Sequence, residues 1–242
     1  MTPAPRPVLV FDVLGTLVDQ AGSLEAAVQG AGLDAGTARD VVATWLGRVA
    51  DRERDVVAGR RGFAPSGVLD REVLAGLAAE GALPASAVDR LATAAERLRP
   101  WPDSVTGVAA LARDFTVLGL SNADRRTLAA LRGDAGLTWH DVLSAEDVGT
   151  YKPDPALYAA AVAAATGGAT DGATGEMSAG PPVMVAAHAW DLRAAAAAGM
   201  RTAYVPRPRG DAPRDDDAFD LHAADLADLH GRLLAGELRT VD

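Results

Sequence analysis

Asp12 lies where an acidic side chain could act as a nucleophile. It follows an apolar run of strand length (residues 8–11) and precedes a turn that contains Gly15 and Thr16. Open α/β sheets keep their active sites at the carboxyl ends of buried strands. A carboxylate held in line with a good leaving group can displace it and form an ester that water then opens. The residue two positions later is Leu14, which cannot donate a proton.

Three further strand ends or turns carry polar side chains, and Thr16 accompanies Asp12 at the first. They are Ser121 with Asn122, Lys152 in the string Tyr151-Lys152-Pro153-Asp154-Pro155, and His188 with Asp191. Because the carboxyl ends of parallel strands meet at one edge of a sheet, we expect these groups to gather near Asp12.

The elements that must position these groups alternate between strands and helices. The expected strands cover residues 7–13, 115–120, 183–187 and 202–205. The helical stretches include residues 125–131, 156–165 and 192–198. Strands that read as continuous apolar runs are buried on both faces, and their alternation with helices is typical of a parallel sheet. The sequence therefore predicts an α/β fold with a doubly wound parallel sheet.

A long helical insertion follows the first strand. Helices are expected over residues 24–29, 38–57, 68–79 and 87–98, with no convincing strand among them. We expect a core domain of residues 1–17 and 100–242 and a helical cap of residues 18–99, placed as a lid over the strand ends. Residues 167–181 are predicted to form a flexible surface loop, and residues 207–217 a solvated loop.

Composition narrows the class of protein. The chain has 242 residues, no cysteine and a formal net charge of −10. Disulfides and thiolate chemistry are therefore excluded, and a surface for nucleic acid or anionic membrane is not expected. No apolar stretch approaches the roughly 20 residues of a membrane helix, and the first residues lack the apolar segment of a signal peptide. We expect a cytoplasmic protein.

The four motifs together resemble the haloacid dehalogenase superfamily. Within it, the chain is most similar to the type II (L-2-haloacid) dehalogenases. The similarity rests on Phe11-Asp12-x-x-Gly15-Thr16-Leu17, Leu120-Ser121-Asn122, Tyr151-Lys152-Pro153-Asp154 followed by Tyr158, and Ala189-Trp190-Asp191. This resemblance implies a Rossmann-like core with a helical cap, hydrolysis of small 2-haloalkanoic acids through an aspartyl ester without cofactor or metal, and a homodimer. It also implies the L enantiomer and inversion at carbon.

The resemblance assigns roles around the nucleophile. Asp12 would attack carbon, and Lys152 would keep it ionised, since a nearby cation favours the charged form. Thr16 and Ser121 would bind the anionic headgroup of the substrate, and Asn122 would face the departing group. Purely structural roles are the alternatives. Asp12 would then be an acid that caps the turn after the strand, and Lys152 an exposed lysine before a helix. The side chains of Thr16, Ser121 and Asn122 would cap turns or helices.

The same resemblance assigns roles to the later motifs. Asp191 would orient or deprotonate the hydrolytic water, although an acid that begins a helix is also a good cap. Tyr158 would hydrogen-bond near Lys152 or simply pack. Trp190 would either wall the pocket or fill the core. His188 stands where an Asn is frequent, and it would hold the water or serve as a structural polar residue.

Two missing acids argue against a magnesium-dependent phosphatase. That chemistry normally uses an acid two residues after the nucleophile to protonate the leaving alcohol, and this position is Leu14. A second acid is usual four residues before Asp191, and this position is Ala187. A halide leaving group needs no proton, so substitution at carbon fits the pattern better.

The chain also departs from the dehalogenase pattern. Type II dehalogenases usually have an arginine in the cap directly after a tryptophan. In this chain Leu46 occupies that position, after Trp45. Arg48 or Arg52 would replace it, or these arginines are solvated partners of Asp51 and Glu53. A serine is common at the position two residues before His188, and this chain has Ala186 there. A phosphatase, a hydrolase of another small electrophile such as a strained ring, and a non-catalytic protein on the same fold therefore remain alternatives.

Overall fold

The computed structural model describes residues 7–167 and 180–238. Its core is a parallel six-stranded sheet in the order β5-β4-β1-β6-β7-β8. The strands are β1 (Val8–Asp12), β4 (Thr116–Ser121), β5 (Asp141–Ser144), β6 (Val183–Ala186), β7 (Arg201–Tyr204) and β8 (Leu221–His222). Every residue of the central strand β1 is buried, as its continuous apolar run predicts. The doubly wound parallel sheet is confirmed.

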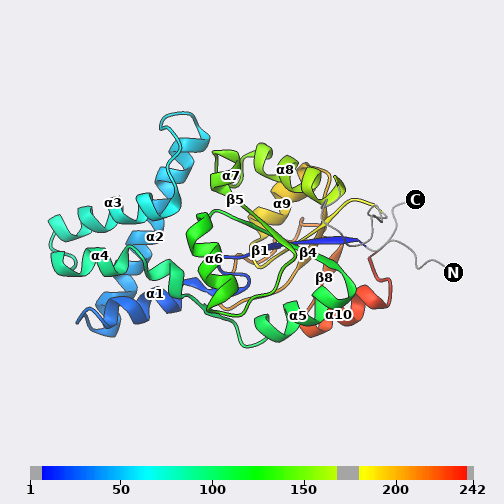
Figure 1. Ribbon diagram of the computed structural model, residues 1–242, viewed down its shortest axis with the longest axis horizontal. Coiled ribbons are helices and arrows are strands. Elements are labelled where there is room, and N and C mark those ends of the chain that lie inside the picture. Colours follow the sequence, from blue (N-terminus) through cyan, green and yellow to red (C-terminus); the bar gives the residue numbers. More distant parts are fainter. Residues whose placement is uncertain (1–6, 168–179, 239–242) are drawn as a thin grey trace.

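Helices cover both faces of this sheet. They are α5 (Ser104–Asp114), α6 (Arg125–Gly133), α7 (Ala145–Val148), α8 (Pro155–Thr166), α9 (Ala189–Ala197) and α10 (Leu226–Leu234). The pairs α5 with α10 and α8 with α9 pack on opposite sides of the strands (Figure 1). Asp154 begins α8 by accepting a hydrogen bond from the Ala156 N–H, and a proline occupies the first turn. This cap places the preceding Lys152 beside the sheet.

The helical cap forms a lobe beside the sheet (Figure 1). It contains α1 (Gln20–Gln29), α2 (Ala35–Val57), α3 (Ser66–Ala79), α4 (Val88–Leu91) and the short 3-10 turns η1 (Ala85–Ala87) and η2 (Ala94–Arg97). Its entrance and exit are joined by an antiparallel pair, β2 (Val18–Asp19) with β3 (Arg99–Pro100). We propose the domain boundaries at this pair, after residues 17 and 99.

Several local predictions were incomplete. The expected helix over residues 87–98 is broken, because the Arg90 carbonyl accepts from Thr93 Oγ1 and Arg97 rather than continuing a helical ladder. Strand β8 was missed because it has only two residues. Strand β5 was missed because it is not a buried apolar run, since three of its four residues are exposed or only partly buried. The expectation of no strand in the insertion missed β2 and β3 at its ends. The predicted loop over residues 167–181 lies mostly outside the described residues.

The segment 207–217 is a loop without buried residues, as predicted, but the prediction missed the contacts of Arg207. The Arg207 side chain is 8% exposed, and its Nε donates to the Thr16 carbonyl at 2.9 Å. Its guanidinium pairs with Asp103 at 2.8 Å and lies 6.0 Å from the Trp101 ring centroid. Charged side chains are buried when an oppositely charged partner lies nearby in the fold, and the local composition of a segment does not reveal that partner. Arg207 thus fastens this segment to the turn that follows β1.

Replacing Arg207 with methionine should destabilise the protein by about 2 kcal/mol, because it removes a hydrogen bond and an ion pair from a mostly buried site. Arg209→Met is the matched control, since the Arg209–Glu25 pair has an arginine side chain that is 46% exposed. That exposed pair should contribute less than about 1 kcal/mol. Urea unfolding of both variants measures the difference, and equal losses would contradict the account.

Candidate active site

A buried lysine joins the two acids that end β1 and begin α9. Lys152 Nζ donates to Asp12 at 2.9 Å and to Asp191 at 2.7 Å. The side chains of all three residues are at most 8% exposed. A pair of carboxylates buried together repel each other unless a cation lies between them. Lys152 supplies that cation, so the sequence-predicted acids meet through it.

Asp12 is fixed through its second oxygen as well. Thr16 Oγ1 donates to Asp12 Oδ2 at 2.6 Å, and His188 Nδ1 lies 3.1 Å from the same oxygen. The Thr16 hydroxyl also accepts from the Ala187 N–H at 2.9 Å. The hydroxyl proton of Thr16 is therefore donated to Asp12, and Thr16 orients the Asp12 carboxylate.

The surroundings set the ionisation of these groups. Burial would raise the pKa of Asp12, but the charge of Lys152 and the hydrogen bonds from His188 and Thr16 outweigh it and hold the pKa well below its usual range. Burial would lower the pKa of Lys152, but Asp12 and Asp191 raise it overall. The carboxylate at Asp12 and the ammonium at Lys152 are thus both charged at neutral pH.

Asp191 has a different environment. Its Oδ1 accepts from the Tyr158 hydroxyl at 2.6 Å, and Oδ2 accepts from Lys152. Burial raises the pKa of Asp191, and the charge of Asp12 adds to the rise while Lys152 opposes it. A carboxylate with a raised pKa is a better acceptor of a proton from water. The sequence predicted a hydrogen bond of Tyr158 near Lys152. Tyr158 donates to Asp191, which itself contacts Lys152.

The turn after β1 leaves room for His188. Gly15 has φ of +85°, and a Cβ built there would lie 2.5 Å from the His188 ring. Only glycine meets both the left-handed conformation and this close approach without strain. The pKa of His188 would fall with burial, but the hydrogen bond and charge of Asp12 raise it overall. His188 therefore contacts the nucleophile candidate directly.

Asn122 connects the core to the cap. Its Oδ1 accepts from the Lys152 N–H at 2.8 Å, and its Nδ2 donates to Glu53 at 3.0 Å. The neighbouring Ser121 is buried, and its Oγ accepts from the Ala123 N–H at 3.1 Å. Sequence reasoning missed Glu53, which it treated as a solvated partner. The available signal was its helical spacing from Trp45 and Val49, two buried residues of α2.

Arg48 and Arg52, the two candidates for the missing cap arginine, both contact acids of the cap itself. Arg48 pairs with Glu80, and Arg52 lies 3.5 Å from Glu72, so both contact acids of α3 and its end. The alternative partners Asp51 and Glu53 were wrong for these two arginines, because helices α2 and α3 pack side by side. Leu46 is partly buried against the hydrophobic core.

Trp190 does not fill the core. Its side chain is exposed, at 38%, and its ring centroid lies 6.0 Å from that of His188. Its backbone N–H donates to Asp211, in the loop after β7. This position beside His188 leaves the pocket-wall role as the remaining alternative.

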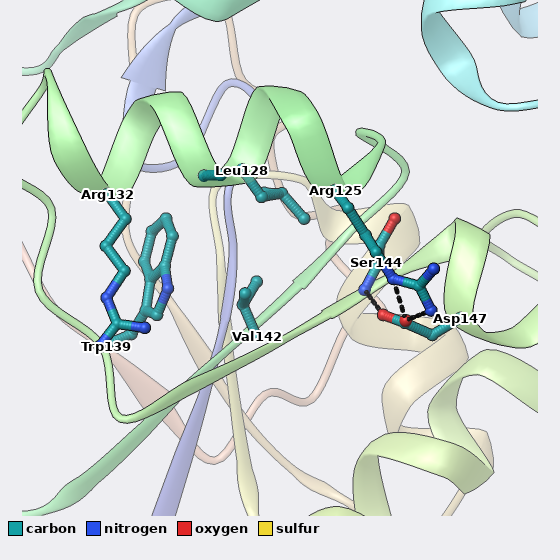
Figure 2. A pocket seen from close by; sticks show the side chains of 8 residues that line it. Arg125, Leu128, Arg132, Trp139, Val142, Ser144 and Asp147 are labelled. Atoms are coloured by element: carbon teal, nitrogen blue, oxygen red, sulfur yellow. Dashed lines mark hydrogen bonds and ion pairs between the residues drawn. The ribbon is translucent and has the colours of Figure 1, made fainter.

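A separate pocket of about 260 Å³ lies at the outer edge of the sheet, over α6 and β5 (Figure 2). It is lined by Arg125, Arg132 and Trp139 among others, and Figure 2 shows Arg125 turned toward Asp147. Asp12, Lys152 and Asp191 do not line it.

Across residues 7–167 and 180–238, no group of three or more His, Asp and Glu side chains is arranged to hold a metal ion. In the same ranges, no helix has the length and hydrophobicity needed to cross a membrane.

Comparison with known proteins agrees with this fold. The model of the family described as haloacid dehalogenase-like hydrolase matches residues 7–199, and the chain belongs to this family of hydrolases. An L-2-haloacid dehalogenase structure is 31% identical, with a TM-score of 0.81 over 95% of this chain and 99% of that one. A search of curated proteins gives no significant match.

Two other solved structures are also similar. A defluorinating L-2-haloacid dehalogenase is 29% identical, with a TM-score of 0.80 over 95% of each chain. The L-2-haloacid dehalogenase from Xanthobacter autotrophicus, solved with chloropropionic acid covalently bound, is 26% identical. Its TM-score is 0.75 over 96% of this chain and 99% of that one.

Lys152→Met should destabilise the protein by roughly 3–5 kcal/mol near neutral pH, because it leaves two buried carboxylates without their cation. The depressed pKa of Asp12 stabilises the wild type above the ordinary aspartate pKa, and this contribution is lost as pH falls. The deficit of the variant should therefore shrink toward about pH 3. Urea unfolding at both pH values measures it.

Adding Asp191→Asn to Lys152→Met is the control for this prediction. The second change removes one of the two like charges, so part of the lost stability should return at neutral pH. A deficit that is independent of pH, with no recovery in the double variant, would contradict the electrostatic account.

Proposed function

We propose that this hydrolase removes halide from small 2-haloalkanoic acids without a metal, through an ester on Asp12. The observation that carries the proposal is the contact of Lys152 with Asp12 and Asp191. It keeps one carboxylate ionised for attack and places a second, more basic one beside it. The similarity to L-2-haloacid dehalogenases supports the same substrate class.

The reaction has two steps. In the first, an Asp12 oxygen forms a bond to C2 of the substrate, and the carbon–halogen bond breaks with its electron pair leaving on the halide. In the second, water adds to the ester carbonyl of Asp12, while Asp191 accepts a proton from that water. Collapse breaks the bond from the ester carbon to the alkoxide oxygen, and the alkoxide takes the remaining hydroxyl proton to leave as the 2-hydroxy acid. The Asp12 carboxylate is restored, and Asp191 gives its proton to solvent. His188 and Tyr158 hold Asp12 and Asp191 in position during both steps.

The surroundings of Asp12 favour this reaction over magnesium-dependent phosphoryl transfer. Asp12 and Asp191 are the carboxylates that a magnesium site would share, and the Lys152 ammonium lies between them. Leu14 and Ala187 offer neither a proton nor a further oxygen ligand from their side chains. We therefore expect activity to persist when divalent cations are chelated. We also propose a homodimer, which sedimentation would test.

Halide release from racemic 2-chloropropionate with excess chelator tests the proposal. The wild type should release chloride, whereas Asp12→Asn should release none, because the amide cannot attack C2. Asp191→Asn should slow turnover by roughly 100- to 10,000-fold and accumulate the ester, visible as a mass increase on the peptide that contains Asp12.

Asp40→Asn is the matched control, because Asp40 is an exposed acid of the cap helix α2. It should keep wild-type release. Full release by Asp12→Asn would overturn the nucleophile, and loss of activity with chelator would favour a phosphatase-like metal site. Binding of a partner with no ester at all would favour a non-catalytic protein.

A further inference from the structure

Glu53 places a carboxyl group of the cap beside the strand ends. It lies on α2, and its Oε2 accepts from Asn122 Nδ2 at 3.0 Å. Asn122 follows β4, whose Leu120 pairs with Asp12 of β1 in the sheet. A continuous set of contacts therefore links the cap acid to Asp12, through Asn122 and then Lys152.

The orientation of the Asn122 amide is determined by its neighbours. Its oxygen must face the Lys152 N–H, which can only donate, so its NH₂ group must face Glu53. The resemblance to dehalogenases implies that Asn122 faces the departing group. A group that departs toward the NH₂ of Asn122 would also approach the Glu53 carboxyl, because these two groups are hydrogen-bonded at 3.0 Å.

The burial of Glu53 favours its neutral form. Burial raises its pKa to about 8, and the nearby Asp70 of α3 contributes in the same direction. The hydrogen bond from Asn122 and the charges of Arg54 and Lys152 oppose this rise without cancelling it. Tyr151 also lies near Glu53, and its pKa is raised by burial and by the charges of Glu53, Asp70 and Asp124, so it is neutral too.

We propose that Glu53 is a proton donor to the leaving group, and that the natural substrate is a 2-substituted acid whose leaving atom departs as a base. This inference rests on the proposed function, because the same Asp12 attack begins the reaction. Chloride and bromide leave without a proton, whereas fluoride or the heteroatom of a strained ring gains most from one. A carboxylic acid at this place therefore assigns the site to the second kind of leaving group.

The step balances without a further co-reactant. Asp12 forms the bond to carbon, the bond from carbon to the leaving atom breaks with its electron pair on that atom, and the Glu53 proton transfers to it. Glu53 is left as a carboxylate, and Asn122 stabilises it by the existing hydrogen bond. Ester hydrolysis then consumes one water, and Glu53 regains a proton from solvent.

The test compares leaving groups in the wild type and Glu53→Gln. The substrates are 2-fluoropropionate, oxirane-2-carboxylate and 2-chloropropionate. Glu53→Gln should lower fluoride release or ring opening by roughly 100-fold, and chloride release by less than about 10-fold. The wild-type rate with the proton-requiring substrate should fall as pH rises through about 8, and this limb should be absent in the variant. Asp55→Asn, an acid two residues further along α2, is the matched control.

A second readout does not depend on turnover. At neutral pH the infrared band of protonated carboxylic acids should be weaker in Glu53→Gln than in the wild type. It should not vanish, because burial also raises the pKa of Asp70 to about 7. A band of equal strength in both proteins, or equal losses for all substrates in the variant, would overturn the proton-donor role. Chloride release with neither fluoride release nor ring opening would overturn the substrate class alone. Absence of any Asp12 ester with every substrate, while the band is weaker in the variant, would instead mark the failure of the proposed function.

Discussion

The buried ammonium of Lys152 is the interaction on which the rest of the site depends. Two carboxylates from different elements, one at the end of β1 and one in α9, could not be buried together as anions without it. Its backbone N–H also orients Asn122. One residue thus joins β1, the end of β4 and α9, which explains why elements far apart in the sequence meet at one edge of the sheet.

The cap adds a second constraint. The pairing of β2 with β3 brings its entrance and exit together beneath the sheet edge, and the contact of Glu53 with Asn122 joins α2 to that edge. The cap therefore brings the Glu53 carboxyl group to the ends of the strands, where the proposed proton transfer would take place. On the core side, Asp12 and Asp191 keep their shared contact with Lys152.

Much of the core site was predictable, because strand ends follow from apolar runs and parallel strands end at one edge. Asp12, Lys152 and Asp191 were placed together on that basis, and the structure brings them into contact. Glu53 and Arg207 were not predictable in this way. The environment of each residue is created by packing between segments that are distant in the sequence. The neighbouring residues in the sequence predict that such charged side chains are solvated.

The most direct test of Asp12 as the nucleophile is a single turnover in water labelled with heavy oxygen, with enzyme in excess over 2-chloropropionate. If Asp12 attacks carbon, the product hydroxyl takes an unlabelled oxygen from Asp12, and the label enters the Asp12 carboxylate. Mass spectrometry of the product and of the peptide that contains Asp12 distinguishes the two fates. Label found in the product, with none in Asp12, would contradict the account, because water would then have attacked carbon directly.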